Sequence, residues 1–267
     1  MTYVGFLVEF VGIPLAILAF LTWRDWHRGY RLPPGLNNQP SWLVLLLHVV
    51  LAVIWTTPWD NYLVATGVWF YNPALVTGIT IGWVPIEEYT FFVVQTLMTG
   101  LWLLWLVRHL RVVTMPAPWR PRVRWVSAAT VGAVWVVAVA ILFAGWQPGT
   151  YLGLELIWML PPIILQLAVG ADVLWHQRRL VALALLPPMV YLVVADALAI
   201  GSGTWAIAPS QSTGVMLGGV LPLEELIFFG LTNVLIVFGM TLFLAIDKQY
   251  LKRLVGCPQP AGASSVN

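Results

Sequence analysis

Long apolar runs separated by short polar segments dominate this chain of 267 residues. Each run is about 20 residues long, which is the length of a helix that crosses a bilayer, whereas strands of membrane barrels are about 10 residues long and alternate. The pattern therefore predicts an all-α integral membrane protein with seven transmembrane helices. We expect these helices near residues 2–23, 42–57, 85–107, 125–146, 152–175, 180–199 and 222–246.

The composition supports the same class of protein. Hydrophobic residues make up 60% of the chain and charged residues only 9%, whereas an ordinary soluble domain carries about 25% charged residues. The single cysteine, Cys257, excludes a disulfide framework and a cysteine-based metal site. The sequence contains no Walker loop and no G-x-G-x-x-G dinucleotide motif, and we expect no nucleic-acid partner.

The positive charges predict the orientation. All 13 lysine and arginine residues follow the first, third, fifth or seventh predicted helix, within residues 24–31, 108–124, 178–179 and 248–253. Seven alternating helices place these segments on one side, which the positive-inside rule makes cytoplasmic. We therefore expect a multi-pass protein of the cell membrane, with its N-terminus outside and its C-terminus inside.

An eight-residue pattern, P-x-E-E-x-x-F-F, occurs twice, from Pro85 to Phe92 and from Pro222 to Phe229. Carboxylates are costly within a membrane and need a reason to be there. Helix capping explains one acid in a first helical turn, but it explains less well why two acids recur before Phe-Phe in both places. Since consecutive helical residues point about 100° apart, one glutamate of each pair can face the partner repeat while the other braces it or meets the preceding segment.

Other residues recur at nearly the same separation, which indicates an internal duplication. The matched pairs are Asp60 and Asp196, Gly67 and Gly203, Trp69 and Trp205, Tyr3 and Tyr151, and Pro14 and Pro162. The first three helices thus correspond to the last three, and the fourth is a connector that keeps both halves in the same orientation. We expect a first repeat at residues 1–110, a cytoplasmic loop and connector helix at 111–147, a second repeat at 148–253 and a disordered cytoplasmic tail at 254–267.

The segment before each glutamate motif is too polar and glycine-rich for a helix. Residues 68–71 and 76–81 flank Asn72-Pro73 and predict a short β-hairpin, and residues 205–207 and 214–217 predict a weaker counterpart. Both hairpins would lie on the extracytoplasmic side, over the glutamates.

The remaining polar residues leave alternatives open. Asp60 with Asn61, and Asp196, end the second and sixth predicted helices, either as interfacial charges or as partners of the glutamates. Glu9, Glu155 and Asp172 lie in or near predicted helices, and His48 suits a satisfied core histidine. Both lysines follow the last helix, so no buried lysine is available for a retinal Schiff base. The acids and the arginines lie on opposite sides, which argues against diphosphate chemistry.

The sequence resembles the heterodimeric-type lycopene cyclases, a flavin-independent membrane family, here as a fused two-repeat chain. The resemblance rests on Pro58-Trp59-Asp60-Asn61-Tyr62, on Gly67-Val68-Trp69 and on the run from Gly82 to Phe92. The second half keeps Asp196, Trp205 and the whole second motif, but it has Val194-Ala195-Asp196-Ala197 in place of Pro-Trp-Asp-Asn. Equivalent roles for Asp60 and Asp196 therefore do not follow.

The resemblance implies cyclisation of the linear ψ-ends of lycopene to β-ionone rings, giving γ- and β-carotene without a cofactor or a metal. An acid protonates C2, the C5=C6 bond attacks the cation at C1, and a base removes the proton from C6. For the acid and the base we predict Glu87, Glu88, Glu224 and Glu225. The proton donor would be Glu87 or Glu224, with a carboxylate of the other repeat as base.

Two further groups of residues complete the predicted site. Supporting roles fall to Asp60, Asn61, Asp196, Pro85 and Pro222. Aromatic rings that stabilise the cation through their π faces would be Trp83, Tyr89, Phe91, Phe92, Phe228 and Phe229.

Three other functions stay open at this point. They are a cyclase for C50 carotenoids or ε-rings, a carboxylate-based transporter, and a carotenoid-binding subunit without activity. A transporter should also carry polar residues deep in other helices, and this chain has few. The expected partners are lycopene or a related linear carotenoid and membrane lipid, with a homo-oligomer or contact with other carotenoid enzymes left open.

Overall fold

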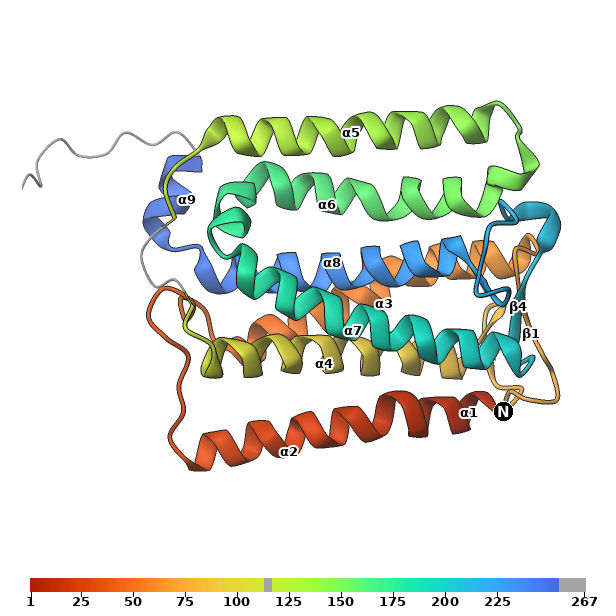
Figure 1. Cartoon of the computed structure of the whole chain (residues 1–267), viewed down its shortest axis with the longest axis horizontal. Helices are drawn as coiled ribbons and strands as arrows, with labels where there is room; N and C mark the ends of the chain where they lie inside the picture. Colours follow the sequence, from red (N-terminus) through yellow and green to blue (C-terminus); the bar gives the residue numbers. More distant parts are fainter. Residues whose placement is uncertain (113–116, 255–267) are drawn as a thin grey trace, which may run out of the picture.

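The computed structural model describes residues 1–112 and 117–254. Residues 113–116 of the predicted cytoplasmic loop, and all of the predicted tail beyond residue 254 with Cys257, lie outside the described residues. In the described part of the chain, seven helices are long and apolar enough to cross a membrane, and they run side by side (Figure 1). This confirms the predicted all-α multi-pass fold.

Each half contributes three of these helices. The first consists of α1 (Tyr3–Phe6), a π-helical segment η1 (Leu7–Gly12) and α2 (Ile13–His27), and it is followed by α3 (Ser41–Ala65) and α4 (Ile86–His109). The connector is α5 (Pro121–Phe143). After the short turn η2 (Gln147–Gly149), the second half contains α6 (Thr150–His176), α7 (Arg178–Gly201) and α8 (Leu223–Ala245). The helix α9 (Lys248–Leu254) follows α8.

The helix α3 continues through Pro58 to Ala65, about two turns beyond the predicted end at residue 57. Proline is tolerated in a membrane helix where hydroxyl side chains and neighbouring helices compensate the backbone. Around Pro58, the neighbouring Thr57 Oγ1 donates to the carbonyl of Val53 at 2.6 Å, and α3 packs against α4 and α8. The expectation that Asp60 and Asp196 end their helices is therefore wrong, since both lie inside α3 and α7 and are buried.

The two helices that carry the glutamate motifs, α4 and α8, pack against each other at the centre of the bundle. Each is also contacted by the second helix of the other half, since α7 reaches α4 and α3 reaches α8. Outside them, α2 packs on α4, α6 packs on α8, and α5 lies against α6 (Figure 1). Apart from α5, the arrangement has the twofold character of two parallel repeats.

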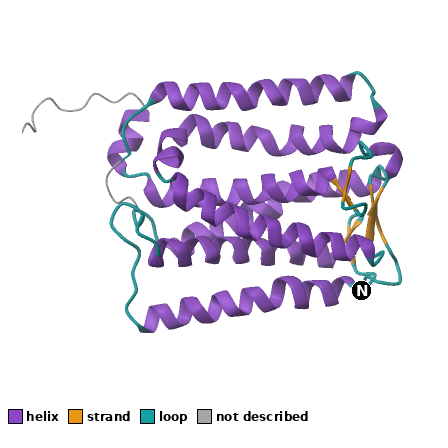
Figure 2. Cartoon of the chain, in the orientation of Figure 1, coloured by secondary structure: helices purple, strands orange, loops and turns teal. Residues whose placement is uncertain are grey.

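Short strands gather at the end of the bundle that holds the N-terminus (Figure 2). Two hairpins form there, β2 (Thr80–Ile81) with β3 (Val84–Pro85) and β5 (Met216–Leu217) with β6 (Leu221–Pro222). The turn between β2 and β3 holds Gly82 at a φ of 67°, which glycine adopts without a steric penalty. Residues 80–81 thus pair with residues 84–85 of the same hairpin and not with β1.

The strand β1 (Trp69–Tyr71) therefore pairs not within its own half but with β4 (Trp205–Ile207), in an antiparallel register that sets Phe70 opposite Ala206. The predicted partners of residues 68–71 and 205–207 are thus wrong. An unpaired strand edge needs a partner, and the equivalent strand of the other repeat supplies it. The β1–β4 pair joins the two halves across the end of the bundle (Figure 1).

The basic segments lie at the opposite end of the bundle (Figure 1), and there each half buries an aspartate near the end of its first helix. Asp25 accepts a hydrogen bond from His109 Nε2 at 2.7 Å. Asp172 pairs with Arg124, with 3.0 Å between Oδ2 and Nη2, and its Oδ1 accepts from the Tyr250 hydroxyl at 2.8 Å. Burial and the bond to Asp172 raise the pKa of Tyr250, so this hydroxyl stays a donor. The second aspartate thus fastens α5 and α9 to α6.

Candidate active site

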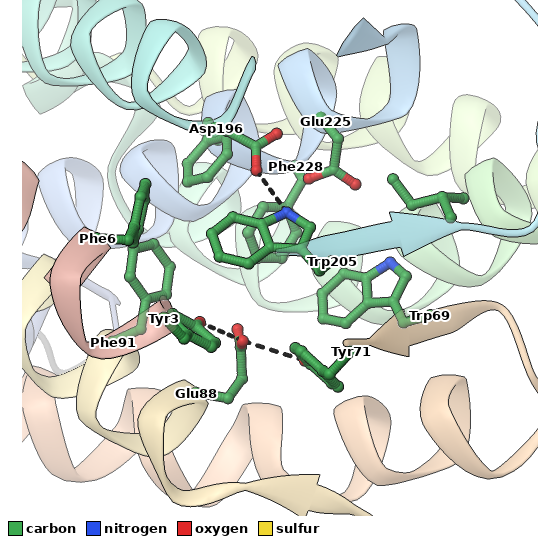
Figure 3. A pocket seen from close by; sticks show the side chains of 12 residues that line it. Tyr3, Phe6, Trp69, Tyr71, Glu88, Phe91, Asp196, Trp205, Glu225 and Phe228 are labelled. Atoms are coloured by element: carbon green, nitrogen blue, oxygen red, sulfur yellow. Dashed lines mark hydrogen bonds between the residues drawn. The ribbon is translucent and has the colours of Figure 1, made fainter. Parts of the chain in front are cut away.

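A cavity lies beside the central helices α4 and α8, against the β1–β4 pair (Figure 3). Both halves and both strands contribute to its wall, which is mostly aromatic with three carboxyl groups. The residues that line it are Tyr3, Phe6, Trp69, Tyr71, Glu88, Phe91, Asp196, Trp205, Ile207, Glu225, Phe228 and Phe229.

Glu88, on the first turn of α4, faces this cavity. Its Oε2 accepts hydrogen bonds from the hydroxyl of Tyr3 and, at 3.1 Å, from that of Tyr71 (Figure 3). Burial and the neighbouring Glu88 carboxyl raise the pKa of Tyr71 well above its usual value. The Tyr71 hydroxyl is therefore a neutral donor, and Glu88 is held by one residue of α1 and one of β1.

Glu225 occupies the matching place on α8. Its Oε1 accepts a hydrogen bond from the Tyr151 hydroxyl at 2.7 Å, and Tyr151 is the repeat counterpart of Tyr3. The carboxyl group of Asp196 lies beside that of Glu225 and accepts from Trp205 Nε1 at 2.9 Å (Figure 3). The two halves thus present equivalent glutamates to one cavity, each fixed by a tyrosine from the first helix of its own half.

Glu87 and Glu224, the first glutamates of the two motifs, brace the preceding loops instead. Glu87 Oε1 accepts from the backbone N–H of Thr77, and Glu224 Oε1 from that of Thr213, both at 2.6 Å. Glu224 also accepts from the Ser212 hydroxyl at 3.1 Å. As expected, one glutamate of each pair faces inward and the other braces the preceding segment. The second glutamate of each motif, Glu88 or Glu225, is the one at the cavity.

We expect Glu224→Ala to destabilise the protein by about 1–3 kcal/mol, because it leaves the part-buried Thr213 N–H and the buried Ser212 hydroxyl without their acceptor. Thermal unfolding in detergent measures the change, with the exposed Glu9→Ala as the matched control. An unchanged unfolding temperature combined with lost activity would contradict the bracing role and point to direct chemistry.

Asn61 and Tyr89 hold the β2–β3 turn rather than line the cavity. Asn61 Oδ1 accepts from Trp83 N at 2.8 Å, and its Nδ2 donates to the Tyr89 hydroxyl at 2.8 Å. That hydroxyl in turn donates to the carbonyl of Ile81 at 2.9 Å. The side chain of Trp83 is 68% exposed. Trp83 and Tyr89, which were predicted to stabilise the cation, therefore lie away from the cavity.

The phenylalanines of the motifs lie at the centre of the molecule. Phe91, Phe228 and Phe229 line the cavity, and the rings of Phe91 and Phe229 meet edge to face with 6.2 Å between centroids. Phe92 is buried against Phe91, behind the wall. Pro85 and Pro222 end the strands β3 and β6, and the helices begin at the next residue.

Two buried acids have no hydrogen-bond partner among the residues that the structure describes. Both carboxyl oxygens of Asp60 are unpaired, and the same holds for Glu155 on α6. Glu155 is 0% exposed, and its ionisable neighbours are Glu225 and Glu224. His48, by contrast, is satisfied as expected, since its Nδ1 lies 2.7 Å from the carbonyl oxygen of Val44.

Sequence reasoning missed the tyrosines and the tryptophan that surround the carboxyl groups. Tyr3, Tyr71, Tyr151 and Trp205 all contact an acid of the site. A signal was available, because Tyr3 matches Tyr151 and Trp69 matches Trp205 in the repeat. Polar and aromatic residues that survive in both halves of a duplication are candidates for its shared site.

Comparison with known proteins identifies a family to which this chain is similar. The family model described as lycopene cyclase matches residues 2–106 and 148–244. A lycopene beta-cyclase of Halobacterium salinarum is 38% identical over 242 residues, which cover 91% of this chain and 95% of that protein.

Longer relatives match over part of their length. A bifunctional lycopene cyclase/phytoene synthase of Podospora anserina is 37% identical over 254 residues, covering 92% of this chain and 40% of that protein. A protein of the same description from Blakeslea trispora is 34% identical over 249 residues, with 86% and 40% covered. No solved structure matches.

Proposed function

This chain belongs to the lycopene cyclase family, and we infer from this that it converts the linear ends of lycopene to β-rings. The observation that carries the mechanism is that Glu88 and Glu225, from opposite repeats, face one aromatic cavity. The enzyme is an intramolecular isomerase, because ring closure neither adds nor removes atoms or electrons.

We propose Glu88 and Glu225 as the acid–base pair. One carboxyl group gives its proton to C2 of the terminal double bond, which leaves a cation at C1. The π electrons of C5=C6 form the C1–C6 bond and move the cation to C5. The other carboxylate removes the proton from C6, and the C5=C6 bond is restored. Carboxyl groups are suited to both roles.

Aromatic rings support the cations between these steps. Phe91, Phe228 and Phe229 line the cavity with the two glutamates, and π faces attract a positive charge. The β1–β4 pair and the Tyr3 and Trp205 rings, 4.8 Å apart, close the site toward the strand end. A site closed to water protects a carbocation from capture by hydroxide or water.

The remaining predicted residues take supporting roles in this proposal. Glu87, Glu224 and Asn61 hold the loops that carry the site, and Asp196 fixes Trp205 and neighbours Glu225. The repeats at residues 1–110 and 148–253 contain the two segments that match the family. We further propose that the strand end is extracytoplasmic and that the protein resides in the cell membrane, since all basic segments lie at the other end.

The test is pigment analysis of lycopene-accumulating bacteria that express this chain alone. We expect γ- and β-carotene at the mass of lycopene, and their ratio gives the number of rings closed per molecule. A strain expressing the double variant Glu88→Gln/Glu225→Gln is the control for background cyclisation. Unchanged lycopene, with the wild-type protein shown to be in the membrane, would contradict the proposal.

A further inference from the structure

The proposed reaction requires Glu88 and Glu225 to differ, since one gives a proton and the other takes one. The repeat, however, surrounds them with matched groups. Tyr3 and Tyr151 bind the two glutamates, and an aspartate of the second helix accompanies each of them, Asp60 in one half and Asp196 in the other. Whatever assigns the two roles must therefore be a departure from the repeat.

The first departure is Glu155. It lies one helical turn after Tyr151, on the same face of α6, and the residue one turn after Tyr3 is Leu7, which is also buried. The equivalent position of the first half is thus occupied by an apolar residue. A buried carboxyl group without a partner lowers the stability of the folded protein. Glu155 forms no hydrogen bond with the described residues that would offset this loss. Its placement next to Glu225 calls for a chemical reason.

The second departure is Tyr71. In the repeat that matches Trp69 with Trp205, the counterpart of Tyr71 is Ile207. The Tyr71 hydroxyl gives Glu88 a second donor beside that of Tyr3. An ionised carboxylate is an acceptor only, whereas a protonated one must also place its O–H. The surroundings of Glu88 therefore suit a carboxylate that is ready to take a proton.

Both glutamates have acidic neighbours, and Glu225 differs from Glu88 in two respects: among the described residues one tyrosine, not two, donates to it, and it faces Glu155, an acid without a counterpart in the first half. Tyr151 and Glu155 face it from α6, Asp196 from α7 and Glu88 from α4, and Glu224 precedes it on α8. All lysines and arginines lie in the segments at the far end of the bundle. Like charges gathered in a medium of low dielectric repel strongly, so this cluster of carboxyl groups is stable only if protons are shared within it.

We propose that Glu155 is a positioning residue that keeps a proton on Glu225, so that Glu225 is the general acid and Glu88 the general base. The proposal rests on the cyclase function argued above. Glu155 does not line the cavity and acts through Glu225. Tyr71 makes the complementary contribution from the other half by holding Glu88 as the acceptor.

Glu155→Leu tests the role of Glu155, because it installs the residue that the first repeat carries. We expect kcat to fall about 10- to 100-fold, at or below the scale of losing a general acid, with an unchanged apparent KM. The unfolding temperature should rise, since an unpaired buried carboxyl group is removed. Glu155→Asp should recover part of the kcat, and Leu7→Met is the matched control. A purely structural role would lower stability and activity together, and that result would overturn the proposal.

Isotope exchange tests which glutamate is the acid. In D₂O, Glu88→Gln keeps the acid, so reversible transfer to C2 should place deuterium in the recovered lycopene. Glu225→Gln lacks the acid and should leave lycopene unlabelled. The reverse pattern would overturn the assignment. If neither variant impaired ring formation, the proposed function of the pair would fail; if both did while Glu155→Leu kept the wild-type kcat, only the role of Glu155 would fail.

Discussion

Glu225→Gln and Glu88→Gln are each expected to lower the rate of ring formation by about 10²- to 10⁴-fold, the usual contribution of a general acid or base. Glutamine has nearly the same shape, and its carbonyl oxygen can still accept from Tyr151 or from Tyr3 and Tyr71. It cannot exchange a proton with a hydrocarbon. The loss should therefore appear in kcat, while the protein remains folded in the membrane. Conversion of lycopene by purified protein in lipid nanodiscs measures the rate.

Glu87→Gln is the matched control, because it changes the neighbouring residue and preserves an acceptor for Thr77 N–H. We expect this variant to keep most of its activity. If Glu87→Gln abolished ring formation while Glu88→Gln did not, the first glutamate of the motif would be the reacting one. The assignment of Glu88 by its position at the cavity would then be wrong.

Arg124→Met is expected to destabilise the protein by about 3–5 kcal/mol, the typical effect of removing one partner from a buried ion pair. Arg124 is 3% exposed, and its guanidinium pairs with Asp172 and stacks 3.6 Å from the Trp119 ring centroid. Without it, the buried Asp172 carboxylate loses the cation with which it pairs. Thermal unfolding of the detergent-solubilised protein measures the loss.

The double variant Arg124→Met/Asp172→Leu separates charge from packing. Replacing both members of a buried pair by apolar residues is often close to neutral, so this variant should recover much of the stability that Arg124→Met loses. Equal instability of the single and double variants would show that the stacking on Trp119 and Tyr250 matters more than the ion pair.

The helices could be predicted because their apolar runs are long and the basic segments fall between alternate ones. The end of α3 could not, since Pro58 is a local stop signal that the surrounding bundle overrides. The pairing of β1 with β4 joins residues from opposite halves of the sequence. Turn residues report only on neighbours in the chain, so they indicated hairpins and gave no information about this pair.

The site could be predicted to the level of the motif but not to the level of the side chain. The 100° step between consecutive residues showed that one glutamate of each pair would face inward, and packing alone decided that it is Glu88 and Glu225. Tyr3 lies near a helix end, where a tyrosine is common at membrane interfaces, so its type and position alone do not mark it as a site residue. Glu155 was visible as an acid in a helix, and its relation to Glu225 needed the structure.

The register of β1 and β4 has an evolutionary consequence. Phe70 and Ala206 are equivalent residues of the two repeats and stand opposite each other, which is the self-complementary contact that two identical units form about a twofold axis. Two copies of one ancestral unit would associate in the same way. Tyr71 and Glu155 each occur in one half only. With the roles proposed for them above, a copy of either half could not replace the other, and the two duplicated units would depend on each other.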